Sequence, residues 1–349
     1  MSSSTTTRAP LLDALNGVRP ERTPIWLMRQ AGRYLPEYRA LRAQHSMLEM
    51  VKTPELAATV TLQPLDRFDL DAAIIFSDIL PPLEELGLHL EFIKGEGPHI
   101  DNPIRTLSDV ERAVAAEIGS VMPFTGEAIG LVRQALASRG IPVIGFTGAP
   151  FTLASYAIEG GPSKHLARTK AFMWQEPVAW DQLMIKLADL AAANLVQQVA
   201  AGAQVVQIFD SWCGELAPAD YRAFVLPYSR RVVEAGKAAG VPVIYFGTGT
   251  SGFLPDLREL GADVIGVDWR TDIRSARSAL GAGVGIQGNL DPLTLFGPVG
   301  VIEERAGSIL EQAAGMDNFV FNLGHGILPE TPIDHVAHLV DYVHRNRST

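Results

Sequence analysis

Short apolar runs recur along the whole chain and carry the main signal for its fold. Each run is continuous in hydrophobic residues, whereas a strand with one wet face would alternate with polar residues. Continuous runs are typical of strands buried on both faces of a parallel sheet. We therefore predict eight parallel strands, at residues 24–28, 72–78, 142–148, 205–211, 242–249, 262–269, 284–290 and 318–326.

Stretches with apolar residues three and four positions apart separate these strands and predict helices. This periodicity runs without a break over 180–203 and over 221–240, which predicts one helix in each range. Ser108 is the expected cap of another helix, because its hydroxyl can accept a hydrogen bond from a free backbone N–H. The stretches 272–281 and 301–315 each end in glycine, as helices often do.

Eight alternations of strand and helix favour a single (β/α)8 barrel, also called a TIM barrel, over residues 10–349. A doubly wound open sheet is the competing arrangement. Its dinucleotide-binding form is disfavoured because no GxGxxG motif follows the first strand. The connection 79–107 is long and predicts a hairpin or another excursion from the barrel. Residues 1–9, rich in Ser and Thr, are expected to be a disordered tail.

Composition narrows the classes of function. Hydrophobic residues make up 47% of the chain and charged residues 19%, which predicts a large core. The net charge of −10 disfavours nucleic acid and anionic membranes as partners, because both bind basic surfaces. No apolar run is long enough to cross a bilayer. The single cysteine, Cys213, permits no internal disulfide, and the chain starts without an apolar secretory signal, so we predict a cytoplasmic protein.

Polar side chains follow nearly every predicted strand, where a (β/α)8 barrel places its active site. After the first strand, the loop carries four arginines although the protein is acidic overall. Because arginine stays charged and binds carboxylates through two parallel hydrogen bonds, the cluster indicates an anion pocket. A solvated basic helix face with surface ion pairs would explain the pattern about equally well. Gly32 permits unusual backbone beside the cluster and favours the pocket. The four arginines are Arg29, Arg33, Arg39 and Arg42.

Three further strand ends carry candidate site residues. Asp78 ends the most hydrophobic strand, where a partly desolvated carboxylate needs hydrogen-bond donors or a positive partner. We favour a carboxylate that faces the barrel mouth to receive N–H groups or to stabilise a cation, although a helix cap assisted by Ser77 would also account for it. Asp210 and Ser211 pose the same question. His325 lies between two glycines that would let a ligand approach closely, which favours a functional role.

Several other chemistries are disfavoured. None of the six lysines ends a predicted strand, which argues against a Schiff base. One cysteine and scattered histidines do not supply the three or four ligands of a zinc site, so we predict no metal, although a carboxylate-rich magnesium site stays open. Cys213 is a weak candidate nucleophile. The glycine-rich residues 247–252 could bind phosphate, but such a sequence is more often a simple turn.

Five long segments together resemble the uroporphyrinogen decarboxylase family. They follow one another in the family's order, and the resemblance spans about residues 10 to 345. It implies a homodimeric (β/α)8 enzyme that uses no cofactor. The implied reaction removes carbon dioxide from the four acetate side chains of uroporphyrinogen III and gives coproporphyrinogen III. The segments are PIWLMRQAGRYLPEYR (24–39), LQPLDRFDLDAAIIFSDIL (62–80), GFTGAPFTLASYAIEGG (145–161), FDSWCGELAP (209–218) and FNLGHGILPETP (321–332).

The resemblance also implies roles for individual residues. Arginines of the first loop would bind substrate carboxylates, and Asp78 would receive the pyrrole N–H groups at the centre of the macrocycle. Asp78, Arg29 and Arg33 form the implied catalytic set. The implied substrate-binding residues are Arg29, Gln30, Ala31, Gly32, Arg33, Arg42, Asp78, Phe146, Tyr156, Phe209, Ser211 and His325.

The implied chemistry is consistent with these residue types. Protonation of a pyrrole carbon creates a cationic ring that accepts the electrons of the breaking carbon–carbon bond, and a fixed Asp78 carboxylate would stabilise that cation. The proton donor stays open between Arg29, which rarely releases a proton, His325, which titrates near neutrality, and a substrate carboxylic acid or water. Two other functions also stay open: a methyltransferase of the same broad superfamily, and a tetrapyrrole carrier without catalysis.

Overall fold

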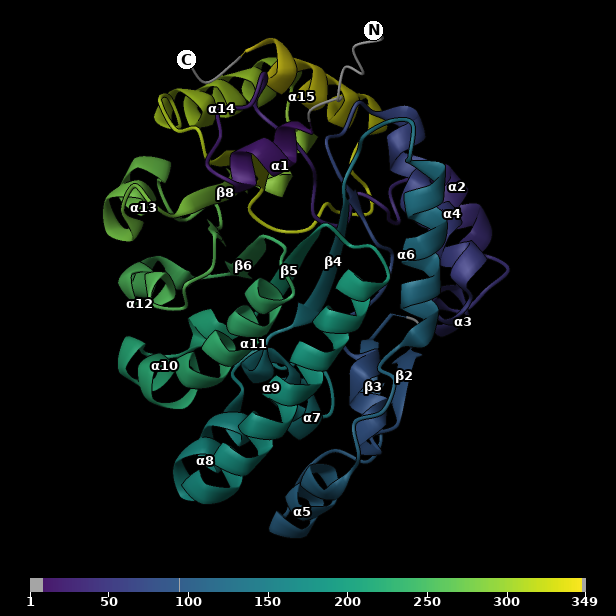
Figure 1. Ribbon diagram of the computed structural model, residues 1–349, viewed down its shortest axis with the longest axis vertical. Helices are drawn as coiled ribbons and strands as arrows, with labels where there is room; N and C mark the ends of the chain where they lie inside the picture. Colours follow the sequence, from purple (N-terminus) through teal and green to yellow (C-terminus); the bar gives the residue numbers. More distant parts are fainter. Residues whose placement is uncertain (1–8, 94, 347–349) are drawn as a thin grey trace, which may run out of the picture.

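The computed structural model describes residues 9–93 and 95–346, and a strongly curled parallel sheet lies at its centre (Figure 1). Within these residues the sheet has seven strands in the order β1-β4-β5-β6-β7-β8-β9. Seven of the eight predicted runs form it, which confirms the parallel α/β fold. The strands are β1 (Ala73–Ile74), β4 (Val143–Gly148), β5 (Val205–Asp210), β6 (Val243–Gly247), β7 (Val264–Gly266), β8 (Gly285–Leu290) and β9 (Phe319–Leu323).

Residues 24–28, the first predicted strand, form no regular strand. On one side, Ile25 makes an isolated parallel bridge to Phe321 in β9. On the other side, the Asp71 N–H donates to the carbonyl of Ile25 at 2.9 Å, and the Asp71 carboxylate accepts the Ile25 N–H at 2.8 Å. The segment therefore joins the two edges of the sheet and closes the barrel. The prediction of a strand here was wrong because a side-chain carboxylate takes the N–H that a strand ladder would use.

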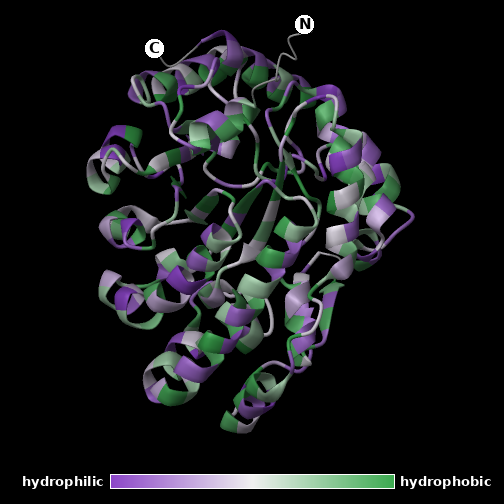
Figure 2. Cartoon of the chain, in the orientation of Figure 1, coloured by the Kyte–Doolittle hydropathy of each residue, from purple (hydrophilic) through white to green (hydrophobic). Residues whose placement is uncertain are grey.

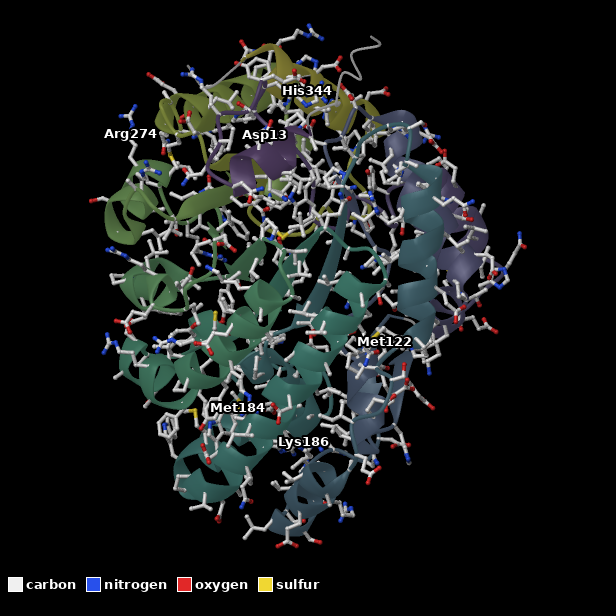
Figure 3. All side chains as sticks on the ribbon, in the orientation of Figure 1. Asp13, Met122, Met184, Lys186, Arg274 and His344 are labelled. Carbon is white, nitrogen blue, oxygen red and sulfur yellow. The ribbon has the colours of Figure 1, made fainter. Side chains whose placement is uncertain are left out.

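Asp71 also connects this closing segment to the end of the described chain. The Arg22 guanidinium donates to Asp71 Oδ1 at 2.8 Å, and Nε2 of His344 lies 2.9 Å from Asp71 Oδ2. His344 belongs to the last helix, α15 (Ile333–Arg345), and is labelled in Figure 3. Asp71 is almost completely buried, so these partners offset the cost of removing its charge from water.

The barrel interior is filled with side chains. At its N-terminal end, Leu11 and Leu15 of α1 (Pro10–Leu15) pack against Trp26. Further in, Trp26 Nε1 donates to Gln287 Oε1, and Gln287 Nε2 donates to Gln207 Oε1, both at 3.0 Å. Gln287, in β8, therefore lies in the packed interior.

Helices surround the sheet, with apolar residues gathered in the strands and the helix faces toward them (Figure 2). A second apolar layer between sheet and helices forms the larger part of the core. The remaining helices are α2 (Pro36–Arg42), α3 (Met47–Lys52), α4 (Pro54–Arg67), α5 (Leu107–Ala115), α6 (Pro123–Ala135), α7 (Pro150–Glu159), α8 (Ala167–Gln175), α9 (Pro177–Ala200), α10 (Pro218–Phe224), α11 (Leu226–Ala238), α12 (Leu254–Arg258), α13 (Ile273–Leu280) and α14 (Val299–Gln312), with short 3-10 helices η1 (Pro81–Leu86), η2 (Cys213–Glu215), η3 (Thr250–Phe253) and η4 (Pro292–Phe296).

Two helix predictions need correction. The range 221–240 contains two helices, α10 and α11, which meet at Val225. Pro227 lies in the first turn of α11 and has no N–H to donate, so one helix cannot continue through it. In α5 the cap is Thr106 and not Ser108, because the Thr106 hydroxyl accepts the Asp109 N–H while the Asp109 carboxylate accepts the Thr106 N–H.

The predicted excursion within 79–107 is confirmed as a hairpin. Strands β2 (Leu90–Ile93) and β3 (Gly97–Ile100) pair antiparallel and stand apart from the central sheet (Figure 1). The hairpin packs near η1 and α3. It therefore adds a wall beside the strand ends that the barrel alone would not supply.

Candidate active site

A cavity of about 1450 Å³ opens at the C-terminal ends of the strands. Pockets for drug-sized ligands usually measure ~300–1,000 Å³, so this cavity suits a larger molecule. Its walls come from the loop after residues 24–28 and from α2, the residues that follow β1, the hairpin, and the loop after β9. The location is the one that the barrel fold predicts.

Most of the predicted site residues meet in this cavity although they come from distant parts of the chain. Two of them, Gln30 and Tyr156, do not lie on its wall. The predicted residues that line it are Arg29, Ala31, Gly32, Arg33, Arg42, Asp78, Phe146, Phe209, Ser211 and His325.

Gln30 has its side chain turned into the protein. Its Oε1 accepts the Leu27 N–H at 3.0 Å, and its Nε2 donates to the Ala72 carbonyl at 2.9 Å. The side chain is fully buried, so it fixes the arginine loop to the start of β1. Tyr156, on α7, packs edge-on against Trp212 with ring centroids 5.9 Å apart. Burial raises the pKa of its hydroxyl, and the charge of nearby Asp78 adds to this effect.

The four arginines of the first loop and α2 all line the cavity. Arg39 Nη1 donates to the carbonyls of Arg33 and Tyr34, and Arg42 Nη1 donates to the carbonyl of His45 at 2.6 Å. Within residues 9–93 and 95–346, none of the four forms an ion pair with a carboxylate of the protein. This argues against the surface ion-pair explanation, because their positive charge is left for an anion from outside.

Asp78 is half-buried at the cavity wall. Its Oδ1 accepts the Leu80 N–H at 2.9 Å, so the carboxylate holds the turn that leads into η1. Burial raises the pKa of Asp78, whereas the N–H group of Leu80 and the charge of Arg29 lower it. Asp78 is therefore not a cap of η1, and its hydrogen bond to the preceding turn occurs together with exposure to the cavity.

His325 is half-buried beside Arg29. Burial lowers the pKa of His325, and the charge of Arg29 acts in the same direction, so the ring is neutral at pH 7. The two flanking glycines accommodate protein atoms, which corrects the interpretation that they admit a ligand. A Cβ on Gly324 would lie 2.6 Å from the backbone nitrogen of Trp269, and a Cβ on Gly326 would lie 2.7 Å from Cγ of Arg29.

Three phenylalanines on neighbouring strands form an apolar floor. Phe146 and Phe209 meet edge-to-face with centroids 5.5 Å apart, and Phe209 and Phe246 do so at 6.0 Å. All three line the cavity. Phe246 was missed in the sequence, although a signal existed: it pairs with Phe209 in the parallel register and so faces the same way.

The hairpin contributes a wall that the sequence analysis did not assign to the site. Phe92 and Ile93 of β2, together with Pro98 of β3, line the cavity. Glu96 and Glu330 also lie at this cavity and are exposed. The signal for the hairpin was the length of the connection after the second predicted strand, but length alone does not show which way such an excursion folds.

Asp210 and Ser211 have different surroundings. Ser211 lines the cavity, whereas Asp210 is fully buried and accepts hydrogen bonds from Thr152 Oγ1 at 2.7 Å and from the Tyr245 hydroxyl at 2.5 Å. Burial raises the pKa of Asp210 to about 6. Burial also raises the pKa of the Cys213 thiol well above its ordinary value, so Cys213 is a poor nucleophile.

Among the residues that the structure describes, no three His, Cys, Asp or Glu side chains gather closely enough to hold a metal ion. None of the helices that the described residues form has both the length and the apolar character needed to span a bilayer.

Comparison with known proteins decides the family. The model of the family described as Uroporphyrinogen decarboxylase (URO-D) matches residues 6–346. The chain belongs to the uroporphyrinogen decarboxylase family. Uroporphyrinogen decarboxylases are carboxy-lyases, so the chain is an enzyme of this class. A uroporphyrinogen decarboxylase from Chloroflexus aggregans is 56% identical over 327 residues, which cover 93% of this chain and 91% of that protein. One from Solibacter usitatus is 48% identical over 336 residues, covering 96% and 97%.

Solved structures support the fold at much lower identity. A methyltransferase from Methanosarcina mazei superposes with a TM-score of 0.79 at 20% identity, covering 96% of this chain and 97% of that one. A B12-independent methionine synthase from Shewanella superposes with a TM-score of 0.58 at 11% identity, covering 93% and 95%. These structures share the barrel architecture of the uroporphyrinogen decarboxylase family, but a shared fold at this identity does not specify a reaction.

Proposed function

We propose that the chain removes carbon dioxide from the four acetate side chains of uroporphyrinogen III and gives coproporphyrinogen III, without a cofactor. One observation carries the proposal: a single large cavity combines arginines that have no carboxylate partner in the described protein, an apolar phenylalanine floor and a half-buried carboxylate. A macrocycle that bears eight carboxylates at its edge and pyrrole N–H groups at its centre matches each of these features. The membership of the chain in the uroporphyrinogen decarboxylase family supports the same substrate.

Substrate binding is assigned to the two kinds of wall. Arg29, Arg33 and Arg42 bind carboxylates, and Ala31 and Gly32 line the same side of the cavity. The macrocycle lies against the phenylalanine floor, where Phe146 and Phe209 contact its apolar edge. Ser211 and His325 are polar contacts at the ends of β5 and β9. Gln30 and Tyr156 support these contacts from behind the wall.

Catalysis is assigned to Asp78 together with Arg29 and Arg33. Protonation of a pyrrole carbon makes the ring cationic, and the electrons of the acetate carbon–carbon bond then flow into the ring as carbon dioxide leaves. A proton added to the resulting methylene gives the methyl group, and the ring carbon returns its own proton. Each cycle consumes one proton and releases one carbon dioxide. Asp78 is fixed by the Leu80 N–H, so its charge is already in place when the cation forms.

The electrostatics of the site bear on the source of the proton. Burial and Arg29 both lower the pKa of His325, which weakens the imidazole as a proton donor. We infer that a substrate carboxylic acid or water donates the proton, with His325 as a hydrogen-bonding partner.

We further infer that residues 10–349 act as one catalytic domain and that two chains associate, as the family resemblance implies. Light scattering measures the association directly, because a homodimer has twice the mass of the 37.7 kDa chain. A monomeric but fully active protein would refute the pairing and leave the activity standing.

The decisive experiment is an anaerobic incubation of purified, chelator-treated protein with uroporphyrinogen III. The products are oxidised and separated by their number of carboxylates. A ladder from eight to four carboxylates supports the reaction and its independence of added metal. Tight binding of the substrate without turnover, in protein shown to be folded, would support the carrier instead. Zinc found in the protein before chelation, together with methyl transfer, would support the methyltransferase.

A further inference from the structure

Gly326 lies in the loop after β9, next to the side chain of Arg29. A Cβ at this position would lie 2.7 Å from Cγ and 2.9 Å from Nε of Arg29, closer than real atoms approach. We propose that Gly326 is a positioning residue whose missing side chain leaves the space in which the alkyl part of Arg29 lies. The inference rests on the proposed function, in which Arg29 binds a substrate carboxylate.

The backbone of Gly326 does not itself require glycine. Its φ does not fall in the left-handed region that favours glycine, so alanine fits the chain there. The three nearest atoms to a Cβ all belong to the Arg29 side chain. The closest contacts of a Cβ would therefore all be with one flexible side chain, and we expect that side chain to move while the backbone stays in place.

Arg29 is held in an unusual conformation that makes this space matter. Its φ of 62° is rare for a residue with a side chain. Hydrogen bonds fix the preceding residue, because the Met28 N–H donates to Asn322 Oδ1 at 3.0 Å and the Ile327 N–H donates to the Met28 carbonyl at 2.9 Å. The backbone thus aims the side chain across Gly326, and rotation of the side chain alone is left to set the guanidinium.

The position of this guanidinium influences the rest of the site. The charge of Arg29 lowers the pKa values of Asp78, His325 and Tyr156, which means that it lies near all three. A displaced Arg29 therefore loses its carboxylate ligand and also changes the field at the proposed catalytic carboxylate. Small errors in the position of such a group are costly, since a shift of about 1 Å can lower a rate by ~10²-fold.

The test is the variant Gly326→Ala, alone and combined with Arg29→Ala. We expect Gly326→Ala to lower kcat/KM for uroporphyrinogen III by roughly 10²-fold, with an unchanged unfolding midpoint. KM should rise because a carboxylate contact is lost, and kcat should fall because the field at Asp78 changes. In the Arg29→Ala background the same change should cost nothing further, because the displaced atoms are absent. Where activity is too low to measure, binding of uroporphyrin III is measured without turnover in the same single and double variants.

Two controls make the outcomes distinct. Gly252→Ala is the matched control, because a Cβ there meets no atom within 4 Å and its φ is also outside the left-handed region. A crystal structure of Gly326→Ala should show Arg29 displaced. An unmoved Arg29, or an equal loss in both backgrounds, would overturn the inference. If the wild-type protein neither binds uroporphyrin nor decarboxylates uroporphyrinogen, the proposed function fails, while a displaced Arg29 in the crystal still supports the steric role.

Discussion

Replacement of Asp78 by asparagine separates the effect of its hydrogen bond to Leu80 from the effect of its negative charge. Asparagine has the same shape, and its side-chain oxygen can still accept the Leu80 N–H that Asp78 accepts at 2.9 Å. The turn into η1 should therefore survive. What is lost is the negative charge at the cavity wall, where the proposed mechanism places a cationic ring.

The size of the effect follows from the position of the carboxylate. Asp78 is only half-exposed, so an effective dielectric constant of ~20 is appropriate, and two unit charges ~4 Å apart then interact by about 4 kcal/mol. Removal of one preorganised group that stabilises a developing charge commonly costs ~10²–10³ in rate, equivalent to about 3–4 kcal/mol. The two estimates agree, and we expect Asp78→Asn to lower kcat by ~10²–10³-fold.

The assay is the anaerobic conversion of uroporphyrinogen III, with products counted by carboxylate number. Asp291→Asn is the matched control, because Asp291 Oδ1 accepts the Leu293 N–H at 2.9 Å in the same local geometry. Asp291 does not line the cavity. Turnover near the wild-type rate in Asp78→Asn would refute the electrostatic role, and an equal loss in Asp291→Asn would assign the effect to the turn.

Three further changes test other parts of the structure. The pKa of Asp210 is about 6 in the folded protein and 3.8 ordinarily, so the folded protein binds the proton more tightly than the unfolded chain. Relative to Asp210→Asn, the wild type should therefore gain up to about 3 kcal/mol of stability as the pH falls through 6 toward 4. A pH-independent difference between the two proteins in urea unfolding would contradict this. Gly324→Ala should destabilise the fold by ~1–3 kcal/mol, because its Cβ would meet the backbone nitrogen of Trp269, which cannot move aside as an arginine side chain can; an unchanged thermal midpoint would count against it. Phe246→Leu should weaken binding of uroporphyrin by about 2- to 10-fold, because it removes an aromatic edge from the cavity floor, and fluorescence titration measures the change.

The sequence was most informative where burial acts on every residue of a segment. Strands β4 to β9 are enclosed on both sides, so their apolar runs stood out and their positions were predicted. The run 24–28 is as apolar as these strands but forms no regular strand. Its partners are the Asp71 carboxylate and the Asn322 amide, which lie 46 residues from Ile25 and 294 residues from Met28 in sequence. A local pattern contains no information about such distant side-chain partners.

The expectation that active-site residues follow the barrel strands located the site, but it did not show which way each side chain points. Asp210 lies between Phe209 and Ser211, which both line the cavity, so the alternation of a strand already requires Asp210 to point outward. Phe246 needs the register as well, because it faces the cavity through its pairing with Phe209 on the neighbouring strand. By contrast, the space at Gly326 depends on where the Arg29 side chain lies, and neither residue reveals the other in the sequence.

The seam of the barrel, where residues 24–28 join its two edges, has a consequence for how the protein is synthesised. The arginine loop and its supports, Asn322 and Gly326, come from opposite ends of the chain, and Met28 and Asn322 are 294 residues apart. At translation speeds of ~5–20 residues per second, the loop emerges about 15–60 s before the strand that holds it. His344, which meets the buried Asp71 beside the seam, is synthesised later still. During this interval the strands already made have an unpaired edge, which is prone to association with other chains until the closing strand is synthesised.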